Sequence, residues 1–467
     1  MAADAPYLTT PPRPPSRPAD LDLAREVVGP DVYARSRAQN GLDGRFVVGS
    51  LDHGEGVQDA AFARGGTAEG HADQWVEAWE ATLGALGVEP DLFIRTSETA
   101  HQRVVKALFL KLFDQDDIAK ATAGGGYILR ASRHEKAIAE ALETRRDAIL
   151  PGPLHEATLR TLGEEGLSDL PISRASDGWG IPVPIDRDQA IEDWFDALVS
   201  YLTSSGYLAD PQLFERTWPP TVQIVTREDL RVHALAWPAL LCAAGLQLPE
   251  HLVVRGRLTV EGAGEAADAV EQFGCDAVRY GLLRAADFTA DATLTTREFV
   301  ELCNADLSER LAGLVANVLA AIEHRSGGVV PRPGSLGDAE GSLVESASGL
   351  FAATSRLVGE LDFRSALDRV WSVVDEAHAY AGGIGLTTAA EGRRLDTALY
   401  ILAETCRLVA FSLRPFLPRA AWAIEARLGV DDEGRTAADL AAWGLTRPQA
   451  RVQSGEPLLP PIALPTS

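Results

Sequence analysis

Lysine is scarce in this chain of 467 residues. Lys106, Lys111, Lys120 and Lys136 are the only lysines, so arginine supplies most of the 43 basic side chains. A strong preference for arginine codons would explain this pattern by itself. Whatever its origin, the pattern excludes any chemistry that depends on a lysine after position 136.

Cysteine is also rare, and its spacing excludes two common uses of thiols. Cys242, Cys275, Cys303 and Cys406 lie far apart, and no CxxC pair occurs. A disulfide framework and a zinc knuckle both need cysteines in closer, paired positions. We therefore expect buried free thiols and no metal site.

The chain lacks the long apolar run of a membrane span, which needs about 18 uninterrupted apolar residues. Its first residues are rich in proline and acidic, which is not typical of a signal peptide. We expect a soluble, cytoplasmic protein that does not bind a membrane. A formal net charge of -24 repels phosphate backbones, which disfavours nucleic acid without excluding a locally basic face.

Along the chain, the spacing of the apolar residues changes between that of β-strands and that of α-helices. Short strand-like runs occur at residues 44–50, 221–226 and 251–260, and they are typical of a buried parallel sheet. Helical spacing marks the segments between them, at residues 20–41, 72–87, 188–206 and 229–245, and nearly everything after residue 296. This order predicts an α/β sheet followed by a helical region.

One segment, "SDGWGIPVP" at residues 176–184, sets a tryptophan between glycines and then holds the backbone extended with prolines. Alone it indicates a rigid loop. Further motifs accompany it in order: "FIRTSETAH" (93–101), "WFDALVSYLTSSGY" (194–207), "HALAWPALLCAAGLQLP" (233–249), "FGCDAVRYGLLR" (273–284) and "NADLSERLAGLVANVLAAI" (304–322). Together they resemble the methionyl-tRNA synthetase family of class I synthetases over residues 6–429.

The resemblance implies an α/β fold with a class I synthetase Rossmann-type catalytic domain, a shortened connective insertion and an all-α, anticodon-binding-like helical domain. We place the first Rossmann half at residues 1–123, the reduced insertion without a zinc knuckle at 124–165, the second half at 166–295, the helical domain at 296–450 and an irregular tail at 451–467.

In the family, the first helix carries the HIGH signature, where histidines, a glycine and the helix N-terminus accommodate the ATP phosphates. Unpaired N–H groups and the positive end of the helix dipole attract anions at such a place. The matching positions here are Asp20, Leu21, Asp22 and Leu23. Aspartate caps a helix well and repels phosphate. We therefore expect its side chain to bond the free N–H groups at this helix start, so that phosphate does not bind there.

The second family signature, the lysine-bearing KMSKS loop, has no counterpart. It should follow residues 251–260, but the chain enters the next helix about nine residues sooner than the family pattern. The missing lysines agree, because this chemistry needs a cation over the transferring phosphates. We interpret Arg255 and Arg257 nearby as solvated arginines at a strand end. We expect no catalytic residue and no cofactor, and we doubt that ATP binds.

Three other family features are changed. The insertion that carries zinc-binding cysteines in many relatives contains no cysteine here. The anticodon-stacking tryptophan of the family falls most simply at Thr387, where a small side chain offers no stacking platform. The family aspartate that binds the amino group of methionine aligns with Leu51. The next two residues, Asp52 and His53, follow the family motif better. Their simpler interpretation is a polar loop beside a strand end.

The side-chain pocket of the family is the feature that remains. Trp194, Ala197 and Tyr201 share one face of a predicted helix, and His233 and Trp237 share a face of another. Such an aromatic stripe is more often core than pocket. The resemblance favours a pocket, because a histidine on an apolar face needs a partner. We predict these five residues as a substrate-binding site.

The loss of these family features favours a protein that no longer charges tRNA or activates methionine with ATP in the ordinary way. Such a protein would be retained as a non-translational module that binds an amino acid, an amino-acid-like ligand or a partner protein. We do not expect tRNA as a partner. An alternative is a tRNA-independent enzyme of specialised metabolism that activates or condenses amino acids, for example with a hydroxylamine towards an N–N bond. It would need Arg13, Arg17 or Arg257 for phosphate contacts. An active methionine–tRNA ligase is the remote alternative.

Overall fold

The computed structural model describes residues 6–54, 56–122, 125–176, 178–384, 393–430, 432–453 and 455–464. The chain divides into two units whose segments interleave along the sequence. Unit 1 consists of Met1–Ala19, Asp43–Gly84 and Val88–Arg257, and unit 2 of Asp20–Leu42, Ala85–Gly87 and Leu258–Ser467. None of the helices in these described ranges is long and apolar enough to cross a membrane.

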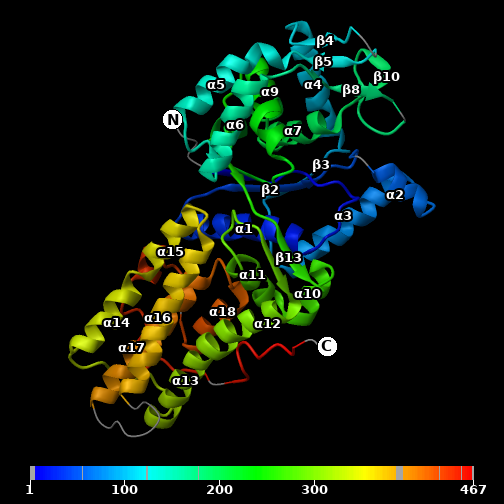
Figure 1. Ribbon diagram of the computed structural model, residues 1–467. Coiled ribbons are helices and arrows are strands. Elements are labelled where there is room, and N and C mark those ends of the chain that lie inside the picture. Colours follow the sequence, from blue (N-terminus) through cyan, green and yellow to red (C-terminus); the bar gives the residue numbers. More distant parts are fainter. Residues whose placement is uncertain are drawn as a thin grey trace. The chain divides into compact units, whose positions relative to one another are not determined.

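Unit 1 contains a six-stranded parallel sheet, of which Figure 1 labels β2 and β3. Its order is β3 (Leu92–Arg95), β2 (Arg45–Ser50), β1 (Tyr7–Thr9), β11 (Val222–Val225), β12 (His251–Val254) and β6 (Ile149–Leu150). The inner strands β2, β11 and β12 are buried along nearly their whole length, as a parallel sheet covered on both faces requires, whereas the edge strand β3 is mostly half-buried. The expected α/β fold is confirmed.

Helices and two small antiparallel sheets complete unit 1. The helices are α2 (Val57–Ala63), α3 (Ala68–Ala85), α4 (Thr99–Asp114), η1 (Ala131–His134), α5 (Glu135–Thr144), α6 (Gly152–Glu165), α7 (Asp193–Ser204), α8 (Pro211–Thr217), the π-helical turn η2 (Val232–Ala236) and α9 (Trp237–Ala244). The small sheets join β4 (Ile118–Lys120), β5 (Tyr127–Leu129) and β7 (Leu170–Pro171), and β8 (Ser173–Ala175), β10 (Asp186–Ile191) and β9 (Pro182–Val183).

The helix predicted over residues 188–206 begins later than its spacing indicates. Residues Asp186–Ile191 form strand β10, which pairs antiparallel with β8 and β9, and α7 starts at Asp193. Cross-strand pairing overrides helical periodicity here, because a strand takes its stability from the neighbours it pairs with. Phe195, Leu198 and Trp237 then pack into one buried hydrophobic core.

Unit 2 contains a two-stranded parallel sheet that the sequence analysis does not predict, because the run at residues 251–260 splits into β12 of the main sheet and β13 of this small sheet. The elements described after residue 296 are helices, as the sequence predicts. The elements of unit 2 are α1 (Leu21–Gln39), β13 (Leu258–Glu261), α10 (Ala266–Phe273), α11 (Cys275–Arg284), β14 (Ala292–Thr295), α12 (Thr296–Cys303), η3 (Asn304–Ala312), α13 (Gly313–Ser326), α14 (Asp338–Ser348), α15 (Leu350–Gly359), α16 (Phe363–Gly383), α17 (Arg393–Leu413), α18 (Pro418–Arg427) and α19 (Ala437–Ala441). Figure 1 shows α14 to α17 packed alongside one another.

Two buried charges hold distant segments of unit 2 together. Arg25 on α1 is fully buried, and its guanidinium donates to the carbonyls of Leu282 at 3.0 Å and Asp287 at 2.8 Å. Glu404 on α17 is equally buried and accepts from the backbone N–H groups of residues 444–446 and from Arg407. Buried charges need such complete hydrogen bonding to be tolerated.

Candidate functional site

The start of α1, where the resemblance places the HIGH positions, is capped by the Asp20 side chain. Asp20 is in extended conformation and its carboxylate accepts from the Leu23 N–H at 2.9 Å. Asp22 accepts from the Leu258 N–H of β13 at 2.9 Å, and Leu21 and Leu23 are buried. The groups that would attract an anion at this helix end are therefore partly occupied, and two carboxylates add negative charge.

A tight turn follows β13, where the resemblance places the lysine-bearing loop. Only residues 262–265 separate β13 from α10, and Gly262 and Gly264 have φ values of 81° and 72°, which glycine adopts without strain. No lysine lies in this segment. Neither residues 20–23 at the helix start nor residues 262–265 of this turn include a lysine or an arginine.

One of the two nearby arginines differs from the prediction. Arg257 is exposed and pairs with Glu228 at 2.7 Å, as a solvated arginine at a strand end would. Arg255 is only 1% exposed, so the prediction that it is solvated is wrong. Its guanidinium donates to the Gly256 carbonyl at 3.1 Å within the fold. A residue directly after a buried strand can continue into the interior, which spacing alone does not reveal.

Tyr201, His233 and Trp237 lie together inside unit 1. The His233 Nδ1 is 2.9 Å from the Asp229 carbonyl, so this nitrogen carries the proton, and Nε2 accepts from the Tyr201 hydroxyl at 2.8 Å. The Tyr201 and Trp237 rings meet edge to face at 5.7 Å, and Trp237 donates to Gln223 at 3.0 Å. His233 thus has the partners that a buried histidine needs.

The other two predicted site residues lie on the same helix but outside these contacts. Trp194 is half-buried, donates to the Pro171 carbonyl at 2.9 Å and packs edge-on against Phe195. Ala197 is also half-buried. Among the described residues, no hydrogen bond or ring contact joins Trp194 to the cluster of Tyr201, His233 and Trp237. Ligand binding by the five residues stays a prediction.

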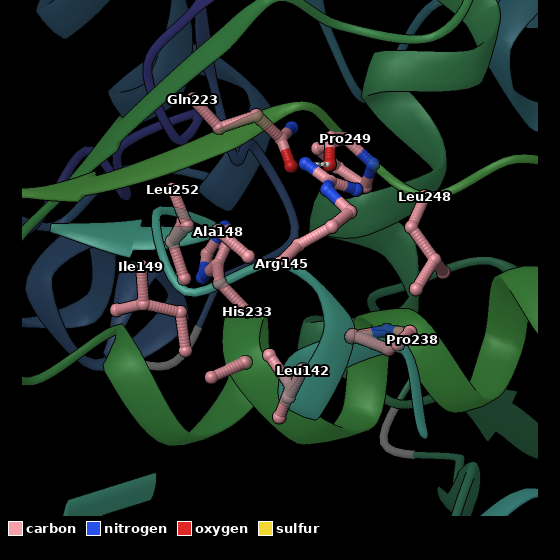
Figure 2. Close-up of a pocket in the computed structure, with 12 residues that line it drawn as sticks. Leu142, Arg145, Ala148, Ile149, Gln223, His233, Pro238, Leu248, Pro249 and Leu252 are labelled. Atoms are coloured by element: carbon pink, nitrogen blue, oxygen red, sulfur yellow. Dashed lines mark hydrogen bonds between the residues drawn. The ribbon is translucent and has the colours of Figure 1, made fainter. Parts of the chain in front are cut away.

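His233 also lines a small cavity of about 40 Å³, which Figure 2 shows together with Gln223, Leu142 and Leu252. At its edge, Arg145 donates to the Pro249 carbonyl at 2.9 Å. A cavity of this size has room for water molecules.

No pattern in the sequence predicts the ion pair between Arg13 and Asp229. The guanidinium donates to both carboxylate oxygens, at 3.2 and 2.8 Å, and Thr226 donates to the same carboxylate at 2.7 Å. Burial alone would raise the pKa of Asp229, but the Arg13 charge outweighs it and holds the pKa well below its ordinary value. The pair joins residues that are far apart in the sequence, so only the fold reveals it.

Asp52 and His53 follow β2 and have different environments. Asp52 is fully buried, accepts from Ser50 at 2.6 Å and Arg95 at 2.9 Å, and is also bonded by Ser97. These bonds make it a structural carboxylate at the strand end. His53 instead lines a cavity in unit 1.

A cavity of about 460 Å³ lies in unit 1, and we call it the polar pocket. Among the residues that line it are His53, Asp59, Arg174, Trp179, Glu192 and Asp193. Behind His53 is the buried Asp196, which bonds the His53 Nδ1 at 3.2 Å and the His101 Nε2 at 2.7 Å. Burial tends to raise the pKa of Asp196, but hydrogen bonds from the two histidines lower it overall. A volume of this order is typical of small-molecule sites.

Comparison with known proteins identifies the family. A family model described as tRNA synthetases class I (M) matches residues 8–134 and 125–319. The methionine–tRNA ligase of Caldanaerobacter subterraneus is 30% identical over 98% of this chain and 78% of that protein. This chain belongs to the methionyl-tRNA synthetase family of class I tRNA synthetases. The methionine–tRNA ligase of Streptomyces coelicolor is 29% identical over 98% of this chain and 97% of its own.

Solved structures of methionyl-tRNA synthetases agree with this assignment. The Mycobacterium tuberculosis enzyme bound by methionyl-adenylate has a TM-score of 0.91 and 26% identity over 98% of this chain and 100% of that chain. The apo form of the same enzyme has a TM-score of 0.86. The fold class predicted from the sequence is therefore confirmed for this chain.

The comparisons correct one expectation. We did not expect tRNA as a partner, but this conflicts with a family whose members found here are named methionine–tRNA ligases. The prediction inferred the loss of a partner from the loss of signature residues, but altered signature positions do not by themselves exclude binding of tRNA. Thr387, the position of the family's stacking tryptophan, lies outside the described residues.

Proposed function

We propose that this member of the methionyl-tRNA synthetase family binds an amino acid but has lost ordinary ATP-dependent activation of methionine and, with it, the charging of tRNA. The observation that carries the proposal is the start of α1, where Asp20 caps the helix and Asp22 holds β13. Two carboxylates occupy the positions at which the family places its phosphate-binding signature.

The loss of the lysine-bearing loop supports the same conclusion independently. Phosphoryl and adenylyl chemistry depends on cations that stabilise the charge developing on the phosphates. The turn at residues 262–265 supplies none, and Arg255 is bonded within the fold. A protein that lacked only one signature could compensate for it, but restoring both needs new cations.

An amino acid is the ligand that unit 1 supports best. The hydrogen-bonded cluster of Tyr201, His233 and Trp237 keeps the aromatic residues of the family, and the polar pocket offers about 460 Å³. Methionine is the first candidate, because the relatives are named methionine–tRNA ligases. The role is non-translational and includes partner binding, with tRNA among the partners to test. No observation favours the alternative in specialised metabolism.

The test is a calorimetric titration of the purified protein with ATP, with methionine and with both, beside a pyrophosphate-exchange assay. The Streptomyces coelicolor methionine–tRNA ligase serves as the active control. We expect binding of methionine, no heat with ATP and no exchange. Exchange above background would contradict the loss of activation, and absence of methionine binding would contradict the binding role. A mobility shift with tRNA reports separately on that partner.

A further inference from the structure

An exposed tryptophan, Trp422, lies midway along α18 in unit 2. All nine tryptophans of the chain fall in the described ranges, and among them only Trp422 is exposed, to 72%. Within these ranges its ring meets no other aromatic ring, and its N–H donates to no residue. Tryptophan is enriched in the residues that contribute most to protein–protein binding, so an exposed one suggests an interface.

A cavity of about 360 Å³ lies beside this tryptophan, also in unit 2, and we call it the α18 cavity. Pro418, Ala426 and Val430 form the apolar part of its wall. Two arginines, two carboxylates and Trp422 itself form the rest. A volume of this order holds a small molecule or one large side chain.

Arg414 is held at the wall of the α18 cavity in one orientation. Its Nε donates to both oxygens of Glu425, at 2.9 and 3.0 Å, and its Nη2 donates to Asp432 at 3.0 Å. The Phe411 ring covers one face of the guanidinium, whose Cζ lies 5.0 Å from the ring centroid. A guanidinium that is already fixed loses little further freedom when a second aromatic ring stacks on its other face.

The α18 cavity also offers a second guanidinium and a hydrogen-bond acceptor. Arg35 on α1 lines it, with Nε donating to Asp31 at 2.9 Å and Nη2 donating to the Gly87 carbonyl at 2.6 Å. The Asp432 Oδ2 takes the bond from Arg414, while Oδ1 has no hydrogen-bond partner within the described residues. An indole N–H needs one acceptor of this kind when it is buried. The cavity therefore has an apolar wall, cations and an acceptor, which together suit an indole.

The charges around the α18 cavity favour a second copy of this chain as the source of that indole. A chain with a formal net charge of -24 repels its own copies, so a contact between copies needs a place where charges balance. Here Arg35 and Arg414 balance Glu425 and Asp432. In a two-fold symmetric contact the same patch meets itself, and each charge can face an opposite one.

We propose that the chain forms a two-fold symmetric dimer in which Trp422 of each copy inserts into the α18 cavity of the other. Each indole stacks on Arg414 and donates its N–H to Asp432 across the interface. A contact of this limited size should be reversible, with a Kd on the order of 1–100 µM. The inference goes beyond the proposed function and does not depend on ligand binding by unit 1.

The test is sedimentation velocity of the full chain at concentrations from about 1 to 200 µM, which span the expected Kd. We expect the sedimentation coefficient to rise with concentration from that of a monomer to that of a dimer. Trp422→Ala should weaken association about 30-fold or more, as loss of a central tryptophan does at interfaces. Phe62→Ala removes an aromatic side chain that is 78% exposed on α2 and is the matched control, which should change nothing.

Two further measurements test the cavity rather than the tryptophan. Ala426→Glu keeps Trp422 but places a carboxylate in the α18 cavity of both copies, at an exposed helix position, and should also weaken association. N-acetyltryptophanamide, an uncharged mimic of a tryptophan side chain in a protein, should occupy the cavity when added in excess. We expect it to convert the dimer of the unchanged chain to monomer.

Each other outcome overturns the inference. A monomer at every concentration does so, and so does a dimer that Trp422→Ala leaves intact. A dimer that persists in excess N-acetyltryptophanamide contradicts insertion into the cavity. Binding of this probe to a chain that stays monomeric would assign the cavity to a tryptophan of another protein and rule out the second copy. The competition uses the unchanged chain, so it decides the matter even where a variant fails to fold.

Discussion

Replacing Asp20 tests whether the start of α1 is closed by its own cap. The Asp20 carboxylate accepts from the Leu23 N–H at 2.9 Å, and it lies at the positive end of a 19-residue helix. Loss of an aspartate cap costs about 1 kcal/mol, and loss of its charge at the helix end adds roughly 0.5 kcal/mol. Asp20→Ala should therefore destabilise the first turn by about 1.5 kcal/mol. Asp20→Asn keeps the acceptor and should lose only the smaller part.

Hydrogen–deuterium exchange of peptides that cover residues 21–25 is the assay, because it reports on the first turn and not on the whole chain. A change of about 1.5 kcal/mol corresponds to roughly tenfold faster exchange at the Leu23 amide. Asp43→Ala, at an exposed aspartate in a loop, is the control. Unchanged exchange in Asp20→Ala would refute the cap. Binding of ATP by Asp20→Asn would show that the charge alone closed the site, and that the missing loop was not needed to explain it.

Three further changes test the internal contacts, each by urea unfolding. Glu404→Ala strands a buried guanidinium and three backbone N–H groups and should cost about 3–5 kcal/mol, and a loss below 1 kcal/mol would contradict its role. Arg13→Met should cost about 2 kcal/mol at pH 7. Because the folded pKa of Asp229 is lowered, this difference should shrink as pH falls below about 4, and a constant difference would contradict the pair. Gly281→Ala places a methyl group against the Phe299 ring and should cost about 1–3 kcal/mol, and an unchanged free energy of unfolding would contradict this close packing.

The sequence predicts the sheet because buried parallel strands are continuous apolar runs, and β2 and β11 are of this kind. It misses β10, since Asp186–Ile191 owes its strand conformation to pairing with β8 and β9. Domain boundaries remain predictions. The short β6 lies within residues 124–165, which we expect as the insertion, yet it pairs with β12 in the main sheet.

Site residues on one helix face are easier to predict than those joined by the fold. Tyr201 and His233 are found by spacing and resemblance, and they do meet. The Arg13–Asp229 pair and the contact of His53 with Asp196 join residues far apart in the sequence. Single-sequence patterns carry no signal for such pairs. Glu192 is similar, because nothing in the sequence distinguishes a capping glutamate from one that faces a cavity.

The long-range hydrogen bonds of Arg25 can form only after a long stretch of the chain has been synthesised. Its partner Leu282 lies 257 residues further on. At about 5–20 residues per second, a ribosome needs roughly 13–50 s to make the missing stretch. Throughout that interval Arg25 on the completed α1 lacks the Leu282 carbonyl that it bonds in the folded chain. We therefore expect nascent chains stalled before residue 282 to be bound by chaperones at α1, and chains stalled well beyond it to be released.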